Sequence, residues 1–98
     1  MKQDPIVPNP GPQPGEKKLS VSLSEYAHYE GRTVFSHALA HGWIAPDQTL
    51  AYRVTGFEYR RVHIAQDCYD TYPCLLLAVL PIDDIDNRPE GWNWTNGD

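Results

Sequence analysis

The sequence predicts a small α+β domain, with one or two short helices packed on a two- to three-stranded antiparallel sheet behind a disordered proline-rich N-terminal leader. Three observations predict this class. Apolar residues recur at helical spacing in residues 23–41, alternate with polar residues in 49–65, and form an unbroken run in 74–80. At 98 residues, the chain has room for one domain only.

Residues 1–17 form the predicted leader. Five prolines stand in it among glycine, asparagine and glutamine, namely Pro5, Pro8, Pro10, Pro12 and Pro14. Because proline fixes its own φ and pushes the preceding residue toward extended conformations, neither a helix nor a strand ladder propagates there. We therefore divide the chain into a flexible leader, a globular domain at 18–82 and an acidic, tryptophan-containing tail at 83–98.

The stretch after the leader predicts a short helical pair or one bent helix. Ser22 and Glu25 have the S-x-x-E spacing of a capping box, so the first helix is expected to begin there. Gly31 is expected to end it, because glycine tolerates the left-handed conformation of a helix end. Thr33 is expected to cap a second helix that runs until Gly42.

Residues 49–65 predict strand structure, because apolar and polar residues alternate. The phase of the alternation moves by one residue past Gly56. Two explanations remain open: bulges at Gly56 and at the pair Arg60-Arg61 within one long strand, or a tight turn at Thr55-Gly56 that divides it.

The apolar run 74–80, bounded by Pro73 and Pro81, predicts a buried central strand, and periodicity alone leaves a helical turn as the alternative. The polar segment before it, with its aspartates and proline, is typical of a loop. The simplest topology is a hairpin that joins the two strands through the loop from Cys68 to Cys74. Aromatic residues are plentiful enough in the globular domain to supply its core.

The net charge of −5 argues against direct nucleic-acid binding, because lysine and arginine supply most of that affinity. A protein partner with a basic surface is the better expectation. No apolar run is long enough for a membrane span and no secretory signal is visible, so the cytoplasm is the default compartment. Cys68 and Cys74 are then expected to be reduced and structural, with a disulfide only in an oxidising compartment.

The acidic tail is the predicted partner-binding site. Carboxylates gather there against a single cation, and two tryptophans stand two residues apart, so that alternation would put both rings on one face of an extended segment. Aromatic rings beside charge are common in binding hot spots. Whether the rings are buried or offered to a partner is left open. The candidate residues are Asp83, Asp84, Asp86, Glu90, Trp92 and Trp94.

Three histidines are weak metal candidates. His37 and His41 are four residues apart on one predicted helix face, and His28 lies upstream. The pentad from His37 to His41 lacks the glutamate of a metallohydrolase motif. We therefore expect two histidines on a helix flank and no cofactor.

A nucleophile, base and acid lie close in sequence as Cys68, His63 and either Asp67 or Asp70. Triads form in space rather than in sequence, so the better interpretation is that the aspartates bond to the backbone of a turn. No glycine-rich phosphate loop is present. We expect a protein that is not an enzyme.

Residues 23–44 resemble a helix-turn-helix of excisionase type, with Ala27 and Gly31 at the four-residue interval of that motif. They depart from it at Glu30, Arg32 and His37, and the second helix lacks basic groove-reading residues. The DNA-binding function is therefore not carried over as the main hypothesis.

The functional hypothesis is a small acidic, non-catalytic protein-binding factor of inhibitor, immunity or anti-defence type, such as a phage-encoded protein, which docks on a basic partner. The alternatives are a metal-binding protein that uses the three histidines and a helix-turn-helix DNA-binding regulator. The partner and the oligomeric state are left open.

Overall fold

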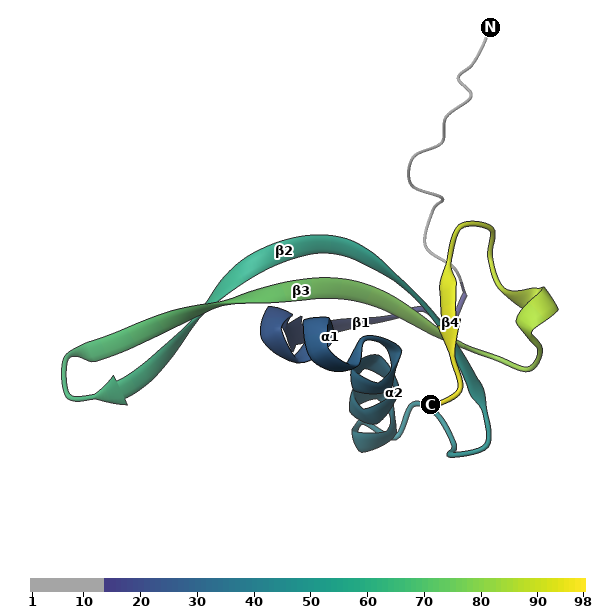
Figure 1. Ribbon diagram of the computed structural model, residues 1–98, viewed down its shortest axis with the longest axis horizontal. Helices are drawn as coiled ribbons and strands as arrows, with labels where there is room; N and C mark the ends of the chain where they lie inside the picture. Colours follow the sequence, from purple (N-terminus) through teal and green to yellow (C-terminus); the bar gives the residue numbers. More distant parts are fainter. Residues whose placement is uncertain (1–13) are drawn as a thin grey trace, which may run out of the picture.

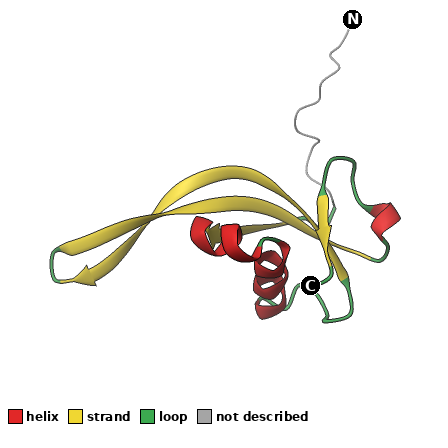
Figure 2. Ribbon diagram, in the orientation of Figure 1, coloured by secondary structure: helices red, strands yellow, loops and turns green. Residues whose placement is uncertain are grey.

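Four strands and two α-helices build the domain, in a computed structural model that describes residues 14–98. The antiparallel sheet has the order β1-β3-β2-β4, and the helices lie on one side of it (Figures 1 and 2). The α+β class is confirmed, but the sheet has four strands where two or three were expected. In chain order the elements are β1 (Lys17–Ser22), α1 (Leu23–Tyr29), α2 (Gly31–Ala40), β2 (Thr49–Ala65), β3 (Cys68–Ile82), the 3-10 helix η1 (Ile85–Asn87) and β4 (Asn93–Thr95).

The two unexpected strands lie at the edges of the sheet. β1 pairs with β3 from Lys17 to Ser22, so the last residue assigned to the leader opens a strand, while residues 1–13 lie outside the described residues. β4 pairs with β2 over only three residues. Both strands are short and depend on a longer neighbour for their hydrogen bonds, which explains why their local sequence pattern is weak.

The helical pair forms with a different boundary from the one expected. Ser22 caps α1, since its side-chain oxygen accepts the backbone N–H of Glu25 at 3.2 Å. Gly31 does not end α1: the left-handed residue is Glu30, at φ 47°, and Gly31 begins α2. Thr33 is not a cap either, because its hydroxyl donates to the backbone carbonyl of Glu25 at 3.2 Å.

Gly31 is required by packing rather than by its backbone angle. A Cβ atom at this position would lie 2.9 Å from the Cβ of Thr95 and 3.2 Å from the hydroxyl of Tyr52. Helix α2 therefore begins directly against β4 and β2. The absence of a side chain lets these three elements meet.

β2 has the predicted bounds, but the hairpin turn lies earlier than expected. Ala65 pairs with Cys68, so the turn is Gln66-Asp67, with Asp67 left-handed at φ 58°. The predicted loop from Cys68 to Pro73 is strand instead. Pro73 and Pro81 are tolerated because β1 covers β3 only from Cys74 to Val79, which leaves each proline with a single neighbouring strand among residues 14–98.

The phase change in β2 is a bulge and not a turn. The register with β3 shifts between Val54 and Gly56, and again between His63 and Ala65, while pairing continues without a shift at Arg60-Arg61. Bulges re-aim a strand and are common at sheet edges. The bulge expected at Gly56 is therefore present, the one expected at the pair Arg60-Arg61 is absent, and the second register shift lies between His63 and Ala65.

The core occupies the part of the sheet under the helices. Val34, Phe35 and Ala38 of α2 pack with sheet residues such as Leu50 and Leu77. A second, smaller cluster lies on the other face of the sheet and comprises Ala51, Ala78, Ile82 and Trp92. Aromatic residues supply part of the core, since Phe35 and Tyr52 are buried in the cluster under the helices, whereas Tyr29, Phe57, Tyr59 and Tyr69 are exposed.

Candidate protein-interaction surfaces

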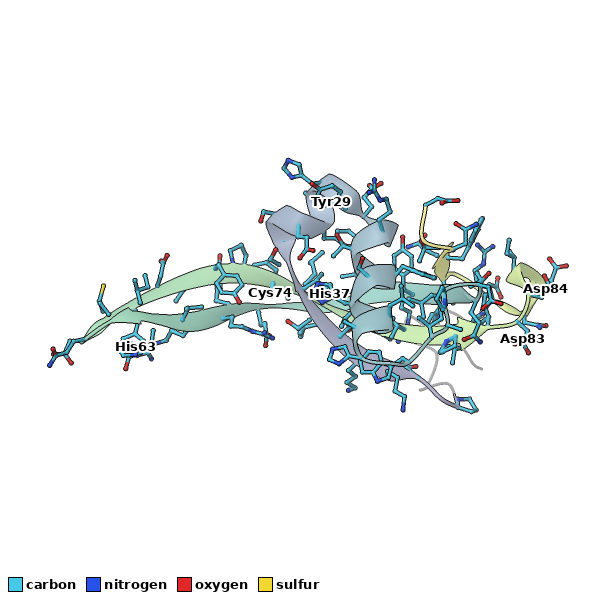
Figure 3. The ribbon with its side chains drawn as sticks, turned by 90° about the horizontal axis from the view of Figure 1, so that it is seen from below. Tyr29, His37, His63, Cys74, Asp83 and Asp84 are labelled. Atoms are coloured by element: carbon cyan, nitrogen blue, oxygen red, sulfur yellow. The ribbon has the colours of Figure 1, made fainter. Side chains whose placement is uncertain are left out.

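The far part of the β2–β3 hairpin projects beyond the rest of the domain (Figures 1 and 3). We call residues 57–73 the arm. None of its residues belongs to either buried cluster, and five large apolar side chains of the arm are exposed, namely Phe57, Tyr59, Val62, Ile64 and Tyr69. An isolated two-stranded ribbon is marginally stable in water, and exposed apolar side chains that gather on it mark an interaction surface.

Aromatic and cationic side chains gather on one face of the arm. Phe57, Tyr59, Arg61 and His63 alternate along β2 without a bulge, so they share a face, and Tyr69 of β3 lies opposite His63. The rings of Phe57 and Tyr59 meet edge to face with their centroids 5.1 Å apart. Tyr69 stacks on the His63 ring at 4.8 Å and lies 4.4 Å from the Arg61 guanidinium carbon. This face therefore carries the residue types that dominate binding hot spots.

The opposite face of the arm carries a charge pair. The guanidinium of Arg60 donates to the carboxylate of Glu58 at 3.2 Å, and this bond raises the pKa of Arg60. The hydroxyl of Ser20 on β1 donates to the same carboxylate oxygen at 3.1 Å. Both side chains of the pair are about half exposed, so they stay open to another molecule.

The predicted acidic site forms a loop at the other end of the molecule (Figure 3). We call residues 83–91 the acidic loop. It is fixed at both ends, because Ile82 before it and Trp92 after it are buried in the same cluster. The carboxylate of Asp84 accepts the backbone N–H of Asp86 at 3.3 Å and caps η1. The four carboxylates of the loop, Asp83, Asp84, Asp86 and Glu90, are all exposed.

The two tryptophans share one face of the sheet but differ in burial. Trp94 pairs with Ala51, which belongs to the same buried cluster as Trp92, so both rings lie on the face away from the helices. Trp92 is 3 % exposed, and its ring lies 5.4 Å from the guanidinium carbon of Arg53. Trp94 is 39 % exposed beside it. Trp92 therefore anchors the acidic loop, and Trp94 is the ring that a partner can reach.

The three histidines have separate neighbours. His37 lies 3.4 Å from the carboxylate of Glu25, His41 stacks on Trp43 with ring centroids 4.3 Å apart, and His28 contacts the backbone carbonyl of Ser24 at 3.1 Å. Within residues 14–98, no three histidine, cysteine or acidic side chains lie close enough to hold a metal ion.

Cys68 and Cys74 are free thiols on the same extended strand. Six residues at roughly 3.3 Å each put them roughly 20 Å apart, well beyond the reach of a disulfide. Cys68 is exposed and Cys74 is buried. The neighbouring acid Asp70 accepts the backbone N–H of its successor, Thr71, at 2.9 Å.

Of the two helices that resemble a helix-turn-helix, α2 is the one that buries residues against the sheet. α1 has no buried residue, whereas α2 turns Val34, Phe35 and Ala38 toward the sheet. The shallow hollow on these helices has a volume of about 300 Å³ and is lined by Glu25, Tyr29, Arg32, Thr33 and Ser36. In the described part of the chain, no helix is long and apolar enough to cross a membrane.

The arm is the surface that the sequence pattern did not reveal. One signal was available: apolar residues occupy both phases of the alternation, with Tyr59 on one face and Val62 on the other. A strand with one buried face keeps a single phase, so the mixture argues against that environment, but a strand buried on both faces would show the same pattern as one with both faces in solvent. Comparison of the chain with protein-family models, curated proteins and solved structures gives no match.

Proposed function

We propose that this chain is a non-catalytic protein-binding factor that docks on a basic partner protein through its acidic loop and Trp94. The observation that carries the proposal is the anchoring of a loop with four exposed carboxylates by Ile82 and Trp92, followed two residues later by Trp94, which is 39 % exposed. A partner that presents lysine or arginine around an apolar depression would match this surface.

Anchoring supports the proposal because it lowers the entropy lost on binding. A loop that is held at both ends has fewer conformations to lose when a partner orders it, so more of its contact energy remains as affinity. The bond from Asp86 N–H to Asp84 restricts the loop further. The loop surface is thus largely preformed.

The negative charge of the acidic loop favours a basic partner. The loop holds four carboxylates against the one cation Arg88, within a chain of net charge −5. Such a field steers a basic partner toward the loop and disfavours acidic competitors. Proteins that bind nucleic acid present basic surfaces of this kind, so an inhibitor, immunity or anti-defence role would follow from competition with the nucleic acid.

The test is capture of a partner by the tagged full chain from extracts of its native host at physiological salt. The loop variant Asp83→Asn/Asp86→Asn keeps the capping residue Asp84 and should lose at least about tenfold in affinity for the captured protein. Trp94→Ala should lose the same partner. Binding of the isolated partner is then measured by calorimetry.

The matched control is Asp47→Asn/Asp67→Asn, which removes the same charge at exposed positions outside the loop. It should bind the partner as the unmodified chain does. If the loop variant and the control weaken binding equally, net charge rather than the loop recognises the partner. A captured protein that is acidic would also overturn the proposal.

A further inference from the structure

The arm presents an open strand edge. β4 pairs with β2 only as far as Tyr52, so from Val54 onward β2 has, within residues 14–98, a neighbouring strand on the β3 side alone. Between the two register shifts, the segment Gly56–His63 is a regular strand. A regular open edge offers a row of backbone donors and acceptors that another strand can pair with.

The same segment carries apolar surface that an added strand would cover. Phe57 is 50 % exposed and Tyr59 is 68 % exposed. A two-stranded ribbon gains stability from a third strand, because that strand satisfies the open edge and shields the neighbouring side chains. The arm is therefore suited to strand addition.

We propose that a second copy of this chain supplies that third strand. The β2 strands of the two copies pair antiparallel around a two-fold axis at Tyr59, which gives a dimer with a continuous four-stranded ribbon of both arms. The dimer does not use the acidic loop, so this inference stands apart from the proposed function.

Symmetry limits the registers that such a dimer can adopt. Directly opposed residues of antiparallel strands point to the same face, so the two-fold axis has to coincide with a residue and cannot pass between two. The residues nearest the middle of Gly56–His63 are Tyr59 and Arg60. An axis at either one keeps the regular segments of both copies in contact.

The charged side chains favour a two-fold axis at Tyr59 over an axis at a neighbouring residue. With the axis there, Glu58 of each copy lies opposite Arg60 of the other, Phe57 lies opposite Arg61, and the two Tyr59 rings face each other. These are favourable opposite-charge, cation–π and aromatic pairs, and each of the first two occurs twice. An axis at Arg60 would place the two Arg60 guanidinium groups opposite each other, and an axis at Glu58 would place the two Glu58 carboxylates opposite each other. Like charges directly opposite each other are unfavourable.

The available area fits a modest dimer. If each ring offers roughly 200 Å², Phe57 and Tyr59 leave roughly 240 Å² in water per copy, and two copies roughly 480 Å². A specific interface buries about 1,000 Å² or more, so the backbone edges, Val62 and Ile64 would supply the remainder. We therefore expect reversible association at micromolar concentrations rather than an obligate dimer.

The test is sedimentation equilibrium of the full chain over a concentration series up to about 200 µM, the range in which a dimer with a micromolar Kd becomes the main species. The mass should rise from 11.1 kDa toward twice that value. Glu58→Arg and Arg60→Glu each place like charges opposite each other twice, so each variant alone should weaken the dimer at least about tenfold. A mixture of the two variants should form a heterodimer, because their opposed charges are complementary again.

The mixture also controls for folding, since an unfolded variant would not form the heterodimer.

The register of the two β2 strands is measured by disulfide cross-linking of variants that also carry Cys68→Ser. Tyr59→Cys should cross-link two copies, because the two residues 59 lie opposite each other, whereas Val62→Cys should not, because its counterpart is six residues out of line. A monomer at all concentrations, a dimer unchanged by both charge variants, or stronger cross-linking through residue 62 would overturn the proposal. The loop variant Asp83→Asn/Asp86→Asn should dimerise normally, so the dimer and the proposed function can fail separately.

Discussion

Replacing Trp92 by alanine tests whether the tail is part of the folded domain. Trp92 is 3 % exposed and packs with Ala51, Ala78 and Ile82. Removal of a buried tryptophan typically lowers the free energy of unfolding by about 3–5 kcal/mol, because the transfer energy is lost and a cavity remains. Trp94 is 39 % exposed and solvent would fill its place, so Trp94→Ala should lower the same free energy by about 1–2 kcal/mol.

The measurement is urea unfolding followed by far-ultraviolet circular dichroism, in which the backbone signal dominates over that of either indole. Trp92→Phe serves as an intermediate variant if the alanine variant unfolds in buffer. The indole N–H of Trp92 is buried and has no acceptor among the described residues, so phenylalanine removes an unsatisfied donor while it keeps most of the ring. Equal losses for Trp92→Ala and Trp94→Ala, or a larger loss for Trp94→Ala, would refute the assignment of Trp92 as the anchor.

Three further predictions concern the core and the thiols. Gly31→Ala should lower the free energy of unfolding by about 1–3 kcal/mol, because the added Cβ would meet Thr95, whereas Ser36→Ala on the exposed side of the same helix should leave the urea midpoint nearly unchanged. Burial and the neighbouring Tyr26 raise the pKa of Tyr52 to about 12 from 10, so the protonated form is favoured in the folded state and stability should fall by at most about 2 kcal/mol between pH 10 and pH 12. Tyr52→Phe should remove that part of the decline in pH-dependent urea unfolding, and an identical decline in the variant would contradict it. A thiol reagent should label Cys68 rapidly and Cys74 only in urea, so rapid labelling that persists in Cys68→Ser would place Cys74 at the surface.

Local sequence patterns predicted parts of both long strands. The apolar run 74–80 gave the central part of β3 because these residues are buried or half-buried together, and alternation gave the bounds of β2 although only the first part of that strand is buried. The cap at Ser22 was also local, since its hydrogen bond spans three residues. These features required no knowledge of which elements meet in space.

Tertiary pairing decided the features that were missed. Gly31 matches a helix stop by residue type, yet its role follows from the approach of Thr95, a residue far along the chain. β1 and β4 exist because β3 and β2 offer them hydrogen bonds. The segment from Cys68 to Pro73 matches a loop in composition, and it becomes a strand because β2 runs alongside it.

Only part of the candidate site could be predicted from the sequence. The four exposed carboxylates could be identified from their spacing, but the different burial of Trp92 and Trp94 depends on where the sheet ends. The arm could not be identified as a surface, because its aromatic residues are of the types usually found in cores. Exposure of such residues is a property of the whole fold.

The exposed arm also implies an uneven resistance to local opening. In the arm, β2 and β3 are held together mainly by their mutual hydrogen bonds. At the other end of the same two strands, around Leu50 and Leu77, buried side chains stabilise the pairing as well. The hairpin can therefore open from its Gln66-Asp67 tip inward while the buried clusters on the two faces of the sheet remain intact. Backbone amides should accordingly exchange with deuterium in a gradient, fastest at the tip and slowest near Leu77. A molecule that pairs with the arm should slow the exchange of the backbone amides near the tip.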